Sequence, residues 1–187
     1  NNKSKVNDQV KYYNSLSVYD HNLNLLNYYN KINLVPFGEF LPMENLLKKV
    51  GLKSLTNNYQ SYSKGQKREI IELNQNNFSI KFLPLICYEI IYSGKLYKND
   101  DFDIIVNISE DGWFGQSIGP EQHFVHSIFR AIETGKYVIR SIFLPGELRS
   151  TTCTRIGSTA SDAPLRLTAS SRLRSTASDI SLKLTLR

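Results

Sequence analysis

Residues 102–108 form a short, nearly continuous apolar run that is bounded by acidic residues on both sides. A run of this length without regular polar alternation is typical of a strand buried on both faces. A strand of this kind needs other elements packed above and below its sheet. The run therefore predicts a central strand of a covered sheet.

Several other segments have the pattern of strands. Residues 70–73 and 78–87 are apolar and flank the turn-rich tetrapeptide Asn74–Asn77, which together indicate a β-hairpin. The other candidate strands are residues 14–19, 28–35 and 137–141. We therefore expect an α/β arrangement with mixed strand pairing.

One helix is expected to begin at Pro120, whose missing N–H is harmless in a first turn, and to end at Gly135. Residues 109–119 are predicted as a loop, and residues 43–66 as a helical turn followed by a polar loop. The apolar stripe of the helix is expected to consist of Phe124, Val125, Ile128, Phe129, Ala131 and Ile132.

The composition changes abruptly after Ser141. Residues 142–187 contain no Asn, no Tyr and 15 Ser or Thr, and the pentapeptide at 158–162 returns at 175–179. We expect one domain over residues 1–141 and a disordered or only weakly structured tail over residues 142–187. The sharp change favours a foreign or frame-shifted origin of this tail over a natural Ser/Thr-rich linker. Because the chain begins with Asn1 rather than Met, we also expect further sequence upstream.

The formal charge of +6 would suit a nucleic-acid or anionic membrane partner. Residues 1–141, however, carry 16 basic and 14 acidic residues, and their tyrosines are not interleaved with a basic stripe, so nucleic-acid binding is a weak alternative. No apolar run reaches the 18 or so residues of a membrane span.

No metal site is predicted. The two cysteines, Cys87 and Cys153, are far apart in the sequence. His123 and His126 are three residues apart on the expected helix, but no third ligand completes a known spacing. No metal or organic cofactor is therefore expected.

Cys87 lies where an apolar strand ends, a common place for sites in α/β sheets. A single cysteine of this kind is more often a small buried hydrophobe than a nucleophile. Lys31 strengthens the nucleophile interpretation, because a nearby cation favours a thiolate and can stabilise an oxyanion. Glu39 follows in a Pro- and Gly-rich turn and could orient this lysine, although both charges could also form a solvated surface pair.

The segment 109–119 contains three glycines and Trp113, the only tryptophan of the chain. A loop of this composition after a buried strand can form a pocket wall. An ordinary connection in which Trp113 simply packs is an equally good interpretation.

These segments together resemble the nitrilase superfamily, and within it the apolipoprotein N-acyltransferase family. The similar segments lie between Tyr12 and Ser141 and comprise Tyr29-x-Lys31-x-x-Leu34-Val35-Pro36-Phe37-Gly38-Glu39-x-x-Pro42, Cys87-Tyr88-Glu89, Asp111-Gly112-Trp113-Phe114-Gly115 and Arg130-Ala131-x-Glu133-Thr134-Gly135. The resemblance implies a partial α-β-β-α sandwich with mixed β-sheets.

The resemblance also implies the roles of five residues. Cys87 would be the nucleophile and Lys31 the catalytic lysine, with Glu39, Tyr88 and Glu89 as supporting residues. The family's general-base glutamate lies on an earlier strand, but Glu39 is the first glutamate of this chain and matches another position. The chain by itself is therefore expected to be inactive.

The activity implied is acyl transfer from a phospholipid, through a cysteine thioester, to the N-terminal amine of an apolipoprotein. The catalytic domain would face the periplasm at a bacterial inner membrane, anchored by segments outside this chain. A nitrilase-like amidase acting on soluble carbon-nitrogen substrates and an inactive binding module on the same fold are the alternatives. The sequence leaves the individual donor and acceptor open.

Overall fold

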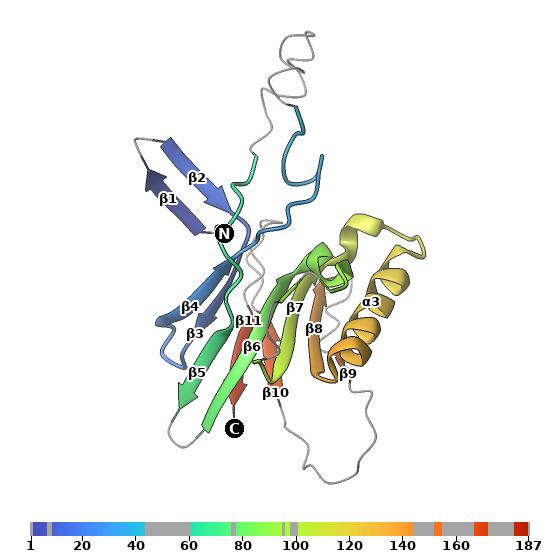
Figure 1. Cartoon of the computed structure of the whole chain (residues 1–187). Helices are drawn as coiled ribbons and strands as arrows, with labels where there is room; N and C mark the ends of the chain where they lie inside the picture. The colour runs from blue at the N-terminus through green and yellow to red at the C-terminus, as the bar shows by residue number, and fades with distance from the viewer. Residues whose placement is uncertain are drawn as a thin grey trace.

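The computed structural model describes residues 2–6, 9–43, 61–75, 78–94, 96–97 and 101–143, and the strands at 152–154, 167–171 and 182–186 (Figure 1). The strands in chain order are β1 (Asn2–Val6), β2 (Gln9–Tyr13), β3 (Ser15–Tyr19), β4 (Leu25–Asn30), β5 (Ile71–Gln75), β6 (Phe78–Ile86), β7 (Ile104–Glu110), β8 (Tyr137–Phe143), β9 (Thr152–Thr154), β10 (Leu167–Ser171) and β11 (Leu182–Leu186). The helices are the 3₁₀ helices η1 (Cys87–Ile91) and η2 (Asp111–Phe114) and the α-helix α3 (Gly119–Thr134).

The main sheet has five strands in the order β5-β6-β7-β8-β9. Strands β6, β7 and β8 run parallel, whereas β5 and β9 pair antiparallel at the two edges. The β5–β6 pair is the hairpin predicted around Asn74–Asn77. Strand β7 is buried from Ile104 to Ser109, as the apolar run predicted. The mixed α/β class is therefore confirmed.

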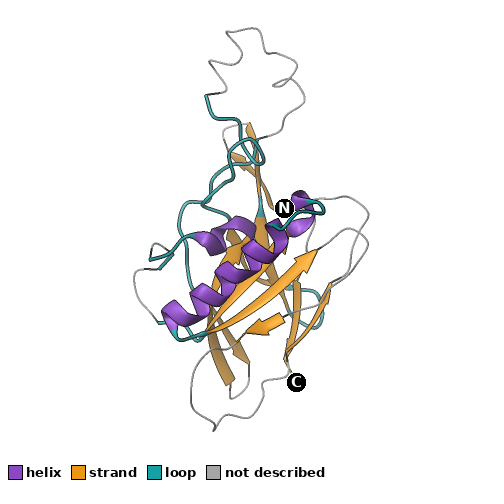
Figure 2. Cartoon of the chain, turned by 90° about the vertical axis from the view of Figure 1, so that its right-hand side faces the viewer, coloured by secondary structure: helices purple, strands orange, loops and turns teal. Residues whose placement is uncertain are grey.

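The sheet buries both of its faces. Helix α3 lies across one face (Figure 2), and the β3–β4 hairpin packs against the other. The first core consists of Leu83, Leu85, Ile90, Leu96, Phe102, Ile105, Ala131 and Val138. The second consists of Leu16, Val18, Tyr29, Ile71, Ile80, Phe82, Ile86, Ile104, Val106, Ile108 and Ile139. Alternate residues of the same strands therefore serve opposite layers, an α-β-β arrangement within the described residues.

Helix α3 has the predicted ends. Pro120 lies in its first turn, and Gly135 closes it in the left-handed conformation with φ 65°. The predicted apolar stripe is wrong in part, because Val125, Phe129 and Ile132 are 40%, 50% and 56% exposed. Ala131 is buried as predicted, but the other buried residues of the helix are His123, Ser127 and Arg130.

The strand predicted at residues 28–35 is displaced, since β4 ends at Asn30. Beyond it the backbone N–H groups of Ile32 and Asn33 donate to the carboxylate of Glu89, and that of Val35 to Glu39. These carboxylates replace the ladder partners that a strand would require.

Three more segments were predicted as loops or as disordered, and the structure describes all or part of each. The loop predicted at 109–119 is shorter, because β7 continues to Glu110 and η2 follows it. Of the segment 43–66, residues 44–60 lie outside the described part, and the rest has no regular structure. In the tail, β9 joins the main sheet and β10 pairs with β11. The expectation of a disordered tail after residue 141 stays a prediction.

Two further antiparallel hairpins, β1–β2 and β3–β4, lie in the N-terminal part of the chain.

Among the described residues no helix combines the length and the apolar character that crossing a bilayer requires.

Candidate functional site

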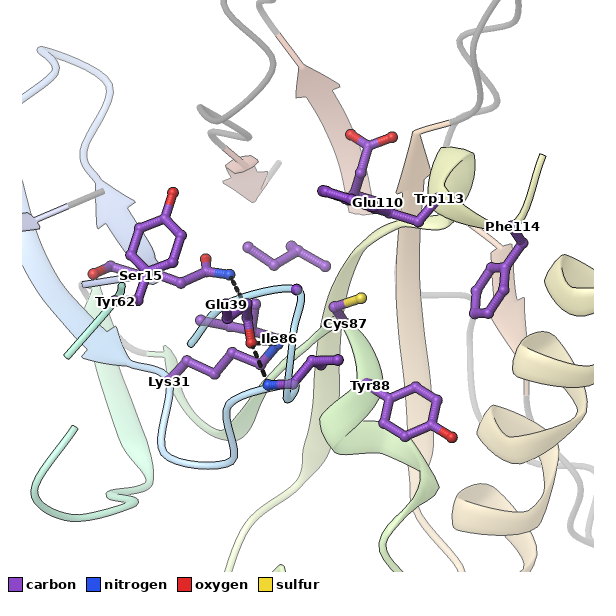
Figure 3. Close-up of a pocket in the computed structure, with 14 residues that line it drawn as sticks. Ser15, Lys31, Glu39, Tyr62, Ile86, Cys87, Tyr88, Glu110, Trp113 and Phe114 are labelled. Atoms are coloured by element: carbon purple, nitrogen blue, oxygen red, sulfur yellow. Dashed lines mark hydrogen bonds and ion pairs between the residues drawn. The ribbon is translucent and has the colours of Figure 1, made fainter. Parts of the chain in front are cut away.

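A cavity of about 460 Å³ lies where β6 and β7 end and the loop after β4 passes beside them (Figure 3). Parallel strands commonly present sites at these carboxyl ends. Its lining is mostly apolar. The residues that line it are Asn14, Ser15, Lys31, Val35, Gly38, Glu39, Tyr62, Ile86, Cys87, Tyr88, Ile108, Glu110, Trp113 and Phe114.

Cys87 forms a sharp turn between β6 and η1. Its φ of 50° lies in the left-handed region, which a residue with a side chain rarely adopts. A turn of this kind raises a nucleophile out of the strand and presents it at the end of the sheet. The thiol is free and half-buried. In Figure 3 it points away from the Lys31–Glu39 pair, toward the side of the pocket that carries Phe114.

Lys31 directly follows β4 and is buried. Its Nζ lies 2.8 Å from Oε2 of Glu39, and the two side chains are 1% and 13% exposed. Glu39 is itself fixed, because it accepts hydrogen bonds from Val35 N at 2.8 Å and from Asn14 Nδ2 at 2.6 Å. The alternative of a solvated surface pair is therefore wrong.

Gly65 contacts the backbone at Lys31 closely and holds it in place. Gly65 N donates to the carbonyl of Lys31 at 2.9 Å. A Cβ at position 65 would lie 2.2 Å from the carbonyl oxygen of Asn30, so only glycine fits this approach. This close contact holds the chain at the end of β4 and so fixes the position of the Lys31 backbone.

Glu89 is fully buried and connects the lysine loop to the cysteine turn. Its Oε1 accepts from Tyr29 Oη at 2.9 Å and from the backbone N of Ile32 and Asn33 at 3.2 and 3.1 Å. Its Oε2 accepts from Ile86 N at 3.0 Å. Arg68 completes the set with an ion pair. Burial, followed by the charge of Glu89, raises the pKa of Tyr29, so this phenol stays neutral.

Tyr88 and Trp113 line the cavity and are exposed. Tyr88 is 39% exposed, and Trp113 is 79% exposed, so the indole contributes an edge of the pocket rather than a packed wall. Glu110 also lines the cavity; it lies in the segment 109–119 that was expected to form a pocket wall, where it was not singled out. Burial raises the pKa of Glu110, and the charge of Asp111 adds to this effect.

Sequence reasoning also missed a buried polar cluster around Arg140. Arg140 donates to Asn107 Oδ1, and its Nη2 donates to Asp111 Oδ2 at 2.7 Å. His123 Nδ1 lies 2.9 Å from Asp111 Oδ1, and Ser109 Oγ donates to the same oxygen at 2.6 Å. Polar residues inside otherwise apolar strands, such as Asn107 and Arg140, were the available signal.

The histidines do not form a metal site in the part of the chain that the structure describes, where no group of three or more possible ligands was found. His123 contacts Asp111 and Arg140 instead. Burial lowers the pKa of His126, which lies on the outer part of α3.

The site therefore combines a cysteine in a strained turn, a buried ammonium group and a mostly apolar cavity. A thiolate here could attack a carbonyl carbon, and the ammonium could stabilise the oxyanion that forms. The apolar lining suits a substrate with a hydrocarbon portion.

Residues 2–145 match the family model described as carbon-nitrogen hydrolase. The apolipoprotein N-acyltransferase of Bradyrhizobium diazoefficiens is 42% identical over 130 residues, which are 69% of this chain and 24% of the relative. The protein of the same name from Rickettsia prowazekii is 39% identical over 137 residues, or 73% of this chain and 26% of the relative. The one from Brucella suis is 36% identical over 134 residues, or 71% and 25%. The chain thus spans about a quarter of the length of these relatives.

Proposed function

The chain belongs to the carbon-nitrogen hydrolase family, and we propose that it provides the nucleophile and the lysine of an apolipoprotein N-acyltransferase. One observation carries this proposal: Cys87 and the buried Lys31 line the same mostly apolar cavity. The similarity to relatives of that name supports the choice of acyl transfer over other chemistry of the family.

In the first half-reaction, the thiolate of Cys87 attacks the ester carbonyl of a phospholipid. A C–S bond forms, the ester C–O bond breaks, and the lysophospholipid leaves with a proton. Lys31 stabilises the negative charge on the carbonyl oxygen, together with the backbone N–H of Tyr88. Glu39 holds the lysine in place through its 2.8 Å ion pair.

In the second half-reaction, the N-terminal amine of an apolipoprotein attacks the thioester. The C–N bond forms, the C–S bond breaks, and the thiol of Cys87 is regenerated. A thioester suits this exchange, because it stores the acyl group in a form that an amine attacks readily.

A general base must accept the thiol proton, and we assign it to a glutamate from outside this chain, because the family resemblance implies a general base on a strand that precedes the lysine motif. Residues 1–38 contain no glutamate, and Glu39 is already occupied by Lys31 and two further donors. We therefore infer that residues 1–187 alone do not turn over. The catalytic domain would face the periplasm at a bacterial inner membrane, and the membrane-spanning segments would belong to other parts of the protein.

The test uses the longer protein that carries this chain, in detergent micelles that contain a phospholipid with a labelled acyl chain. We expect a hydroxylamine-sensitive label on Cys87. The label should be absent from Cys87→Ala and strongly reduced in Lys31→Met. An unlabelled wild-type protein that instead releases ammonia from soluble amides would overturn the proposal in favour of an amidase. A protein with neither activity would favour an inactive binding module.

A further inference from the structure

The left-handed turn at Cys87 needs a partner that holds it, because the preceding strand would otherwise continue in the extended conformation. The carbonyl oxygen of Cys87 accepts a hydrogen bond from Asn107 Nδ2 at 3.3 Å. The same amide nitrogen donates to the carbonyl of Leu85 at 3.2 Å. One side chain on β7 thus connects the last part of β6 to the turn that carries the thiol.

Asn107 is itself held in one orientation. It is fully buried, and its Oδ1 accepts from Nη1 of Arg140, which is 2% exposed. A rotated amide would direct its oxygen at two carbonyl oxygens and its nitrogen at the guanidinium group. The arginine therefore determines which way the amide points.

Arg140 is positioned in turn from its other side. Its Nη2 donates to Asp111 Oδ2 at 2.7 Å and lies 2.9 Å from His123 Nδ1. The guanidinium charge is thus balanced by a buried carboxylate, and the planar fork contacts both β7, through Asn107, and η2, through Asp111. A lysine has a single nitrogen and could not make both contacts in this geometry.

We propose that Asn107 is a positioning residue for the nucleophile and that Arg140 acts through it. The amide fixes the backbone turn of Cys87, and so the direction from which the thiol enters the cavity. The inference rests on the proposed function for the role of this thiol. The hydrogen bonds themselves would be the same for any reaction at Cys87.

The experiment measures the alkylation rate of Cys87 by iodoacetamide against pH, in the 187-residue chain with Cys153→Ser as background. Asn107→Asp keeps an acceptor oxygen for Arg140 but removes the amide N–H groups that donate to the carbonyls of Leu85 and Cys87. We expect its rate constant at high pH to fall by about tenfold and its pH profile to shift, because a misdirected thiol reacts more slowly. Arg140→Lys should give an intermediate change.

Val138→Ala is the matched control, because Val138 is fully buried on β8 but belongs to the core next to α3. It should lower the stability and leave the pH profile of alkylation unchanged. The proposal is overturned if Asn107→Asp alkylates like the background chain, or if Val138→Ala changes the profile equally.

A measurement without a variant covers the case in which neither substituted chain folds. In the background chain, the side-chain amide protons of Asn107 should exchange slowly with solvent, and rapid exchange would refute the contact. None of these readouts involves a lipid. A wild-type protein that forms no acyl adduct would overturn the proposed function and leave the positioning result standing.

Discussion

The Nζ of Lys31 lies 2.8 Å from Oε2 of Glu39, and only 1% of the lysine side chain is exposed. An ammonium group this far from water is stable only when an opposite charge accompanies it. Glu39 therefore holds the side chain of Lys31 in place and balances its charge. The lysine is then available to an oxyanion without prior desolvation.

Glu39→Gln should destabilise the chain by about 3 kcal/mol, because it leaves the buried ammonium without a counter-charge. Urea unfolding measures this difference. Glu69→Gln is the control, since its ion pair with Lys67 is exposed (68% and 77%) and should be worth less than about 0.5 kcal/mol. Lys31→Met combined with Glu39→Gln should be more stable than Glu39→Gln alone. Equal unfolding midpoints for the two glutamine variants would contradict the buried pair.

Glu89→Ala should lower the free energy of unfolding by about 3–5 kcal/mol, more than Glu39→Gln does. The substitution leaves the charge of Arg68 uncompensated and three backbone N–H groups without acceptors. It should also abolish acylation of Cys87 in the longer protein, since the lysine loop and the cysteine turn lose their common partner. Glu72→Ala on β5 is the control, because Glu72 is exposed. A Glu89→Ala chain with an unfolding midpoint close to that of the control would refute this role.

The left-handed backbone conformation at Cys87 can be tested by stability measurements alone. With φ at 50°, glycine should be preferred at this position over any residue with a Cβ. We expect Cys87→Gly to be more stable than Cys87→Ala by about 1 kcal/mol in thermal or urea unfolding. An alanine variant at least as stable as the glycine variant would show that the turn is not left-handed in solution.

The elements with strong local signals were predictable from the sequence. The apolar run of β7, the turn between β5 and β6, and the Pro120 and Gly135 ends of α3 depend on neighbouring residues alone. The end of β4 was not predictable, because the carboxylates of Glu39 and Glu89 that bind the following N–H groups come from distant positions. The sequence contains no local mark of such a partner.

The candidate site divides in the same way. Cys87 and Lys31 were candidates from the strand end and the nearby cation, the family resemblance implied their roles, and the structure places both in one cavity. The contacts among Asn107, Asp111 and Arg140 were missed, because a single polar residue in an apolar strand, or in the loop after it, does not indicate which distant residue it will bind. These residues are buried only because they bind one another across strands, a relationship that appears only after folding.

Asp111 should give the chain an acid-sensitive stability. Burial raises the pKa of Asp111, but the hydrogen bond from His123, the charge of Arg140 and the hydroxyl of Ser109 outweigh it and hold the pKa below its ordinary 3.8. The unfolded chain then binds the proton more readily, so this stabilisation is present above pH 3.8 and is lost as the pH falls through the lowered value.

Urea unfolding between pH 7 and the acid limit checks this expectation. Asp111→Asn should be less stable at pH 7 and should lose less stability on acidification than the wild type. Asp101→Asn is a suitable control, because Asp101 is exposed and pairs only with Lys81 among the described ion pairs. Parallel pH profiles for wild type and Asp111→Asn would contradict the buried carboxylate.

The outer face of α3 gives the last prediction, which tests the corrected assignment of its buried side. Phe129 is 50% exposed, whereas Ala131 is fully buried against the sheet. Phe129→Lys should change the free energy of unfolding by less than about 0.5–1 kcal/mol, because half of this side chain already faces water. Ala131→Leu should cost about 1–3 kcal/mol, because three more carbon atoms must enter a filled core. If Phe129→Lys proved the more damaging change in urea unfolding, the helix would present its apolar side inward in solution, as the sequence pattern alone suggested.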